Sequence, residues 1–412
     1  MRITAPDSAE SVPLDEIDLY APERYRDGSQ HAAWQTLRRQ APVWWHERPG
    51  QPGFWSVTRF ADCERVLKEH RTFSSASGTV LGSIETGDPA GGRTISLMDP
   101  PEHTGLRTAS MRSFSHSVLR GRADRIQEQV RRLVQPCLDG EQDFAHLMRR
   151  LPMAITGELI GIPEEHWDPI AFWTAAGISP EDPAFAVGPT TAHTLRRAHH
   201  ELFARFSELI AHRRRHPGSD LISALLELRP DGRRMEDGDV LLNCYSFMAG
   251  ANSTTPHVAG QTLLALIEHP SWWAWLREDP ERTPVVVEEG VRWTATPHHL
   301  VRRAVRDTEI SGVRISAGDW VCAWVGSAHR DEAVFDDPYR LDPQRPPNQH
   351  IGFGIGPHYC IGAPLSRIAL RALFEELVSK FEQIELAGPV THLTSNWVNG
   401  LSSMPVLGKP RR

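Results

Sequence analysis

Hydrophobic and polar positions follow two different periods along this chain, and the change of period separates a helix-rich part from a strand-rich part. Between about residues 101 and 292, apolar residues recur at intervals of three and four, as they do on an amphipathic helix. The pattern predicts helices over 198–213, 240–269, 285–292 and 363–381. Strict alternation and β-branched residues predict strands near 53–57, over 300–325 and in the tail from 390 to 407.

These elements indicate a mostly α-helical fold with small β regions, a large helical body beside a small sheet-rich lobe in the α+β class. No repeat, low-complexity tract or Gly/Ser linker interrupts the chain. Because domain boundaries usually fall in such linkers, we expect one domain over residues 1–412. A short N-terminal segment, about residues 1–15, is expected to be flexible.

Composition and charge narrow the class of protein. The 412 residues include 45 Lys and Arg against 52 Asp and Glu, a net charge of -7, which argues against nucleic acid as the main partner. The N-terminus has no basic stretch followed by an apolar one, and no apolar run approaches the length of a membrane span. We therefore expect a cytoplasmic protein with no membrane association.

Cysteine usage points to one site. The five cysteines are scattered and show no metal-finger spacing, so four are expected to be small buried apolar residues without disulfides. The fifth, Cys360, ends the stretch HIGFGIGPHYC that begins at residue 350. Three alternating glycines there permit positive φ angles and close approach of a flat ligand to the backbone. Taken alone, Cys360 would be interpreted as a buried thiol in a glycine-rich turn.

The neighbours of Cys360 add chemistry to this loop. Phe353 lies seven residues earlier, far enough along the loop to fold back over the sulfur. A helix is predicted to begin just after the cysteine, with Pro364 in its first turn, a favoured position for proline. Backbone N–H groups at such a helix start stabilise a negatively charged sulfur.

The spacing of Phe, Gly, His, Cys and Gly in this loop resembles the haem-binding loop of the cytochrome P450 family, and the resemblance extends from about Trp34 to Leu407. It implies the triangular, single-domain P450 fold and haem b, with the iron ligated by the Cys360 thiolate. The cofactor-binding positions implied in the loop are Phe353, Gly354, His358, Cys360 and Gly362. Outside the loop they are His103, Arg107, Ala249, Gly250 and Arg302, with His103, Arg107, Arg302 and His358 on the haem propionates.

The resemblance also implies a structural ion pair. Glu289 and Arg292 stand three residues apart on a predicted helix, and an isolated pair of this kind is usually a solvated surface pair. In the family such a pair joins a second arginine, for which Arg345 is the candidate. Its role is to hold the haem loop rather than to take part in the chemistry.

The helix over 240–269 resembles the one that crosses the oxygen-binding face of the haem, where small residues at 249 and 250 leave room for dioxygen. At the positions where the family carries an acid and then threonine, this chain has Asn252 and Ser253, with Thr254 as the alternative hydroxyl if the register differs by one. An amide cannot deliver a proton as an acid. Pro256 lacks an N–H, so it either frees the Asn252 carbonyl to hold a water or merely bends the helix for packing.

Segments that contact substrate follow only from the resemblance. They are residues 77–97, 172–191, 248–253, 297–300 and 397–401. Within them, His298 or His299 could donate a hydrogen bond to a polar substrate, although we expect at least one of the two to face solvent.

The expected function is that of a monomeric, bacterial-type monooxygenase that oxidises a medium-sized organic metabolite, in natural-product tailoring. Members of this length receive NAD(P)H electrons through a separate ferredoxin reductase and ferredoxin, and Arg112, Arg367 and Arg371 are candidate docking cations. The unusual residues at 252 and 253 keep open a second reaction, oxidative coupling, ring closure or desaturation without oxygen insertion. A peroxide-driven enzyme would carry Arg-Pro there, and a non-catalytic haem sensor or carrier would need an output module; neither feature is present.

Overall fold

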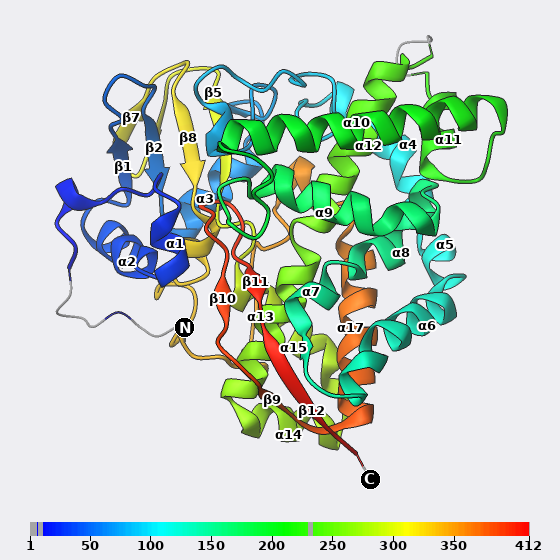
Figure 1. Ribbon diagram of the computed structural model, residues 1–412. Helices are drawn as coiled ribbons and strands as arrows, with labels where there is room; N and C mark the ends of the chain where they lie inside the picture. Colours follow the sequence, from blue (N-terminus) through cyan, green and yellow to red (C-terminus); the bar gives the residue numbers. More distant parts are fainter. Residues whose placement is uncertain (1–5, 7–10, 230–233, 412) are drawn as a thin grey trace.

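A helical body and a sheet-rich lobe lie side by side in the computed structural model, which describes residues 6, 11–229 and 234–411 (Figure 1). This is the predicted mostly α-helical fold with small sheets. Of the N-terminal segment expected to be flexible, positions 1–5 and 7–10 lie outside the described residues. Within the described part of this segment, Val12 is attached to α2 (Gln30–Gln40), because its backbone N–H donates to Oγ1 of Thr36 at 3.1 Å.

The lobe is built on a five-stranded sheet with strand order β1-β2-β8-β5-β3, in which only the β2–β8 pair is parallel. Its strands are β1 (Val43–His46), β2 (Phe54–Val57), β3 (Phe73–Ser74), β5 (Leu300–Ala304) and β8 (Trp320–Ala323). All four residues of β8 are buried, because helices and loops cover the sheet. The lobe helices are α1 (Glu23–Asp27), α2 (Gln30–Gln40), α3 (Phe60–Lys68) and α16 (Val325–Ala328).

Smaller sheets accompany the five-stranded one in the described part of the chain. A three-stranded sheet joins β4 (Gln142–Asp143), β12 (Pro405–Pro410) and β9 (Phe381–Leu386). Two-stranded pairs are formed by β6 (Thr308–Ile310) with β7 (Val313–Ile315) and by β10 (Thr391–His392) with β11 (Leu401–Ser403). The strands predicted over 300–325 and in the tail are thus present.

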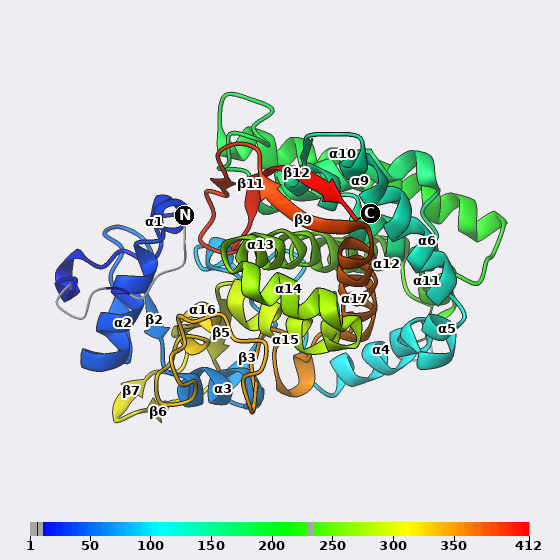
Figure 2. The same ribbon diagram turned by 90° about the horizontal axis from the view of Figure 1, so that it is seen from below.

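The helical body packs around one extended apolar core. Its helices up to the middle of the chain are α4 (Glu102–Ser110), α5 (His116–Arg120), α6 (Ala123–Val134), α7 (Phe144–Met148), α8 (Leu151–Ile160), α9 (Trp167–Ile178), α10 (Thr191–Arg215) and α11 (Leu221–Glu227). The later ones are α12 (Asp237–Asn252), α13 (Thr255–Glu268), α14 (Pro270–Glu278), α15 (Thr283–Thr294) and α17 (Ala363–Lys380). Seen from below, α13, α14 and α15 lie in successive layers beside α17 (Figure 2).

The single helix predicted over 240–269 is instead two helices. α12 ends at Asn252, and α13 begins at Thr255 with Pro256 in its first turn. Thr254 has φ -125° and ψ -55°, outside the helical region. Proline cannot donate the N–H that would continue the ladder to the Asn252 carbonyl, so the sequence interrupts the helix at the residues predicted to deliver protons.

A fully buried ion pair connects α15 to the segment that leads into the cysteine loop. The two carboxylate oxygens of Glu289 accept from Nε and Nη2 of Arg292, both at 2.7 Å, and both side chains are 0% exposed. The backbone N–H of Asp342 and the amide of Asn348 donate to the same carboxylate at 2.8 and 3.0 Å. Nε of Arg345 lies 3.8 Å from Glu289, so the three residues predicted as a structural cluster meet.

The expectation that His298 or His299 faces solvent is wrong, because both are buried between the lobe and the C-terminal loop. His299 accepts at Nε2 from the N–H of Leu81, while Nδ1 lies 3.1 Å from the carbonyl oxygen of Asn396. Neither ring nitrogen of His298 has a hydrogen-bond partner among the described residues, and its ring lies 4.9 Å from that of Tyr25. Burial lowers the pKa of both histidines to about 3.

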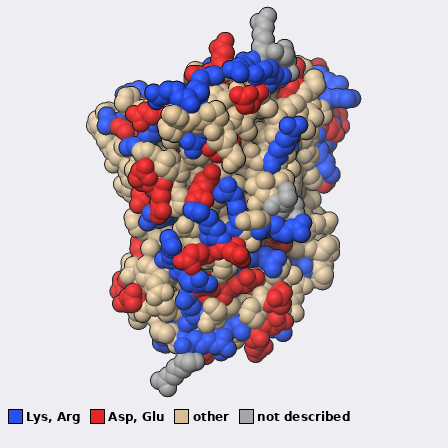
Figure 3. Space-filling view, turned by 90° about the vertical axis from the view of Figure 1, so that its right-hand side faces the viewer, with Lys and Arg blue, Asp and Glu red and all other residues tan. Residues whose placement is uncertain are grey.

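The surface alternates in charge on the face formed by α5, α6 and α8 (Figure 3). Arginines there are paired with acids: Arg125 contacts Glu158, and Arg132 lies 3.0 Å from Glu128. No helix in the part of the chain that the structure describes is both long and apolar enough to cross a membrane.

We expect Arg292→Met to lower the free energy of unfolding by about 3–5 kcal/mol, because it leaves the buried Glu289 carboxylate without its cation. Urea unfolding followed by tryptophan fluorescence measures this loss. The matched control, Arg197→Met, breaks an exposed pair with Glu201 and should cost about 0.5 kcal/mol or less. Equal losses in the two variants would contradict the role assigned to the buried pair.

The buried histidines predict a loss of stability in acid. Between the ordinary histidine pKa of 6.5 and the folded value of about 3, the unfolded chain binds a proton that His298 in the folded chain does not. Stability is therefore complete above pH 7 and falls on acidification, by about 2 kcal/mol per such histidine at pH 5. His298→Gln should reduce the difference between urea unfolding at pH 7.5 and at pH 5. His200→Gln, at an exposed position, should leave it unchanged.

Candidate functional site

The loop that carries Cys360 folds back on itself as the sequence predicts. The backbone N–H of Cys360 donates to the carbonyl of Phe353 at 2.8 Å, which closes the loop. Gly354 and Gly356 have φ of +69° and +72°, a conformation that favours glycine. Gly352 is needed for a different reason, since a Cβ there would lie 2.5 Å from Cγ1 of Val291 on α15.

Cys360 lies just before α17, and the residue as a whole is exposed. Its crowded surroundings raise the pKa of the thiol, whereas the backbone N–H groups of Gly362 and Ala363 and the charge of Arg107 lower it. Each of these lowering groups favours the thiolate. Burial is the larger effect, so the pKa of the thiol is raised overall, and these groups would stabilise the thiolate once a metal ion binds the sulfur.

Four nitrogen donors from three segments gather beside this loop. His103 and Arg107 come from α4, Arg302 from β5, and His358 from the loop itself. The rings of His103 and His358 lie 4.3 Å apart, and Nη2 of Arg107 donates to the carbonyl of Tyr359 at 2.5 Å. Burial, with the nearby arginine charges, lowers the pKa of His103 to about 4 and that of His358 to about 2, so both are neutral.

Some nitrogen atoms of this cluster have no hydrogen-bond partner in the part of the chain that the structure describes. Nε2 of His103 and Nε2 of His358 are buried without a partner among the described residues. Arg302 is 3% exposed, bonds only to the carbonyl of Val301 at 2.8 Å, and forms no ion pair with a described carboxylate. Burying an unpaired cation is costly, so the cluster requires an anionic partner. The two carboxylates of a haem fit this donor set, with Cys360 available to the iron.

The oxygen-facing residues lie at the break between α12 and α13. Ala249 is half-buried, and a Cβ built at the exposed Gly250 would meet no atom within 4 Å, so this surface is open. The hydroxyl of Thr254 donates to the Gly250 carbonyl at 3.3 Å, while Ser253 is 2% exposed. The Thr254 hydroxyl thus lies beside the open stretch of α12, and Ser253 is buried at the end of that helix.

Asn252 turns away toward the neighbouring helices. Its Nδ2 lies 3.4 Å from Oγ1 of Thr174 on α9 and 3.6 Å from Sδ of Met153 on α8. Its Oδ1 is buried without a partner among the described residues. The surroundings of the amide are therefore neutral.

A second set of contacts under the loop was missed by the sequence reasoning. Arg367, one of the candidate docking cations, forms a two-pronged ion pair with Glu288 at 2.6 and 2.8 Å. His350 lies 3.1 Å from the same carboxylate. The adjacent glutamates at 288 and 289 could have indicated this second pair. Consecutive residues on a helix point in different directions, so Glu288 cannot share the partner of Glu289. Arg112 is exposed, and Arg371 lies 3.6 Å from Glu375.

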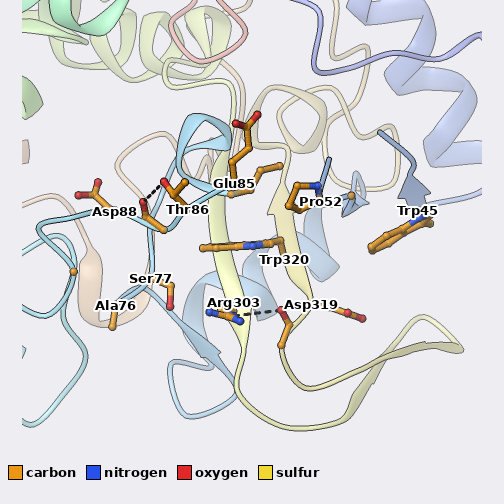
Figure 4. Close-up of a pocket in the computed structure, with 15 residues that line it drawn as sticks. Trp45, Pro52, Ala76, Ser77, Glu85, Thr86, Asp88, Arg303, Asp319 and Trp320 are labelled. Carbon is orange, nitrogen blue, oxygen red and sulfur yellow. Dashed lines mark hydrogen bonds between the residues drawn. The ribbon is translucent and has the colours of Figure 1, made fainter. Parts of the chain in front are cut away.

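A surface cleft of about 700 Å³ opens on the outer side of the sheet-rich lobe (Figure 4). Trp320 lies across its middle, with Glu85, Thr86 and Asp88 of the 77–97 loop on one side and Trp45 on the other. None of the residues predicted to bind the cofactor lines it. It therefore lies outside the site around Cys360 and borders one of the segments predicted to contact substrate.

Comparisons with known proteins agree with this geometry. The family model for cytochrome P450 matches residues 187–405. Linalool 8-monooxygenase of Pseudomonas putida is 32% identical, with 97% of this chain and 100% of the relative covered.

Two solved structures extend the likeness to the whole chain. The Mycobacterium marinum P450 CYP268A2 in complex with pseudoionone has a TM-score of 0.89 and 33% identity over 97% of this chain and 100% of that one. OxyD, a P450 involved in the biosynthesis of vancomycin-type antibiotics, has a TM-score of 0.85 and 33% identity over 96% and 100%. With its folded cysteine loop and its unpaired donors, this chain belongs to the cytochrome P450 family of haem-thiolate monooxygenases.

Proposed function

We propose that Cys360 ligates the haem iron and that His103, Arg107, Arg302 and His358 hold the two propionates. The observation that carries this proposal is the cluster of unpartnered donors beside the loop, since a buried cation without an acid needs an anionic ligand. Bound haem supplies the activation of dioxygen at an iron that a thiolate enriches in electron density.

The chain's own residues orient and stabilise this cofactor. The N–H groups of Gly362 and Ala363 would stabilise the charged form of the sulfur against the effect of burial, and the carbonyl of Phe353 anchors the backbone of Cys360. Ala249 and Gly250, in the last turn of α12 before the break, would leave room for dioxygen, since a Cβ at Gly250 meets no atom within 4 Å. Glu289, Arg292 and Arg345 keep the approach to the loop rigid.

Proton delivery in this chain relies on hydroxyl groups and water. Ser253 and Thr254 supply the hydroxyls, and Asn252 takes the position of the family's acid. An amide binds water as donor and acceptor but does not ionise in this range. Reactions that begin with hydrogen abstraction and end in coupling, ring closure or desaturation place smaller demands on such a relay. They are therefore the second candidate for the reaction.

The proposed reaction is the oxidation of a medium-sized organic metabolite, as a step in natural-product biosynthesis. Three comparisons support a substrate of this size and class. One relative is a linalool monooxygenase, one similar structure holds pseudoionone, and a third similar protein is involved in antibiotic biosynthesis. We further propose a monomeric cytoplasmic enzyme formed by one domain over 1–412. Its electrons come from NAD(P)H through a ferredoxin reductase and a ferredoxin, with Arg112 and Arg371 at the docking face.

Cys360→Ser should abolish the red-shifted reduced carbon-monoxide band of a thiolate-ligated haem, because the hydroxyl cannot supply the thiolate. Cys137→Ala, which removes a buried cysteine that packs in the core, should keep the band. Retention of the thiolate band in the Cys360 variant would refute the assigned ligand.

Turnover of the native protein separates the three classes of function. Product formation with ferredoxin, reductase and NAD(P)H supports the monooxygenase proposal. Turnover with peroxide alone indicates a peroxygenase, and haem binding without turnover under either condition indicates a sensor or carrier. A spectral screen of substrate-induced shifts, run first on terpenoids and on peptide-derived metabolites, identifies the compounds to test.

Asn252→Asp should change the fraction of electrons that enter product and the ratio of products, because it introduces an acid beside the hydroxyls. A carboxylic acid at this buried position would have no described cation within bonding distance, so its pKa would be raised and it could hold a proton. Thr174→Val, which removes the partner of Asn252 without adding an acid, is the control. Unchanged coupling and products in the Asp variant would exclude a special role for Asn252.

A further inference from the structure

Glu288 and Arg367 join α15 to α17 directly beneath the cysteine loop. The guanidinium of Arg367 is held in a forked ion pair, with Nε and Nη2 on the two oxygens of Glu288. His350, at the start of the loop and 4% exposed, lies against the same carboxylate. The pair itself is about one-third exposed, so its geometry is fixed by these bonds more than by burial.

Arg367 also contacts the cysteine loop at two further points. Its guanidinium carbon lies 4.3 Å from the centre of the Phe353 ring, within the range of a cation–π interaction. Its remaining terminal nitrogen, Nη1, donates to the hydroxyl of Tyr359 at 2.9 Å. These two aromatic residues are the ones whose backbones flank Cys360, since Phe353 accepts its N–H and Tyr359 precedes it.

We propose that Arg367, held in place by Glu288, is a positioning residue that fixes the cysteine loop and sets the electrostatic potential at the Cys360 sulfur. The inference rests on the proposed function, because it takes Cys360 as the iron ligand. In the second turn of α17, Arg367 is the side-chain cation that contacts both residues flanking the sulfur. Its charge adds to that of Arg107 in favouring the thiolate.

The two partners should act on the iron with opposite signs. A positive charge near the sulfur withdraws electron density from the ligand, so removing Arg367 favours the oxidised, more positive iron. Removing the carboxylate of Glu288 leaves the cation less neutralised and favours the reduced iron. A purely structural pair would not behave in this way, because breaking it from either side would disturb the loop alike.

The experiment measures the reduction potential of the haem-loaded protein in Arg367→Gln, Arg367→Lys and Glu288→Gln. We expect a negative shift for Arg367→Gln, a positive shift for Glu288→Gln, and a potential near the native value for Arg367→Lys, which keeps the charge. The control is Arg371→Gln, which removes an exposed cation one turn further along α17 and should cause no shift.

One spectral readout, the reduced carbon-monoxide band, keeps this inference separate from the assignment of Cys360. The carbon-monoxide band must remain of the thiolate type in the variants whose potentials are compared, and loss of it in Cys360→Ser tests the ligand alone. Shifts of equal sign in Arg367→Gln and Glu288→Gln, or no shift beyond that of Arg371→Gln, would overturn the proposal. If Arg367→Gln fails to bind haem, the other two variants decide: a positive shift in Glu288→Gln with a native potential in Arg367→Lys supports it, and any other result refutes it.

Discussion

The buried carboxylate of Glu289 is the contact on which the rest of the site depends. A charge removed from water is destabilising unless several donors surround it, and this one receives two bonds from Arg292 and one each from Asp342 and Asn348. Those donors come from a helix and from the coil that runs directly into the 350–363 loop. Neutralising one carboxylate therefore determines the path of the chain before it reaches Cys360.

Helix α15 also connects to the loop through Glu288, the residue that precedes Glu289. Glu288 points toward α17 and binds Arg367, while Glu289 points into the core. Because successive residues on a helix are rotated by about 100°, one turn of α15 holds both sides of the loop. The rigidity of the cysteine site thus comes from two ion pairs of different character, one buried and one about one-third exposed.

The two sides of the proposed haem site differ in their electrostatics. On the side of Cys360, cations and N–H groups face the sulfur and the positions of the propionates. On the opposite side, Asn252 is surrounded by neutral groups, a threonine hydroxyl and a thioether. Under the proposed function, this asymmetry leaves Ser253, Thr254 and water as the proton donors on the oxygen side, where the family carries an acid.

The sequence by itself determined the class of fold and the cysteine loop, because helical and strand periods and the spacing around Cys360 are local properties. It also predicted the pairing of Glu289 with Arg292, which are three residues apart. Only the tertiary structure decided which groups lose water. Arg367 and Glu288 are separated by 79 residues and His299 and Asn396 by 97, so no local pattern reveals that these side chains meet. The interruption at Pro256 was foreseeable as a bend, and the structure shows that α12 ends at Asn252 and that α13 begins at Thr255, where the proline lacks the N–H that would continue the helix.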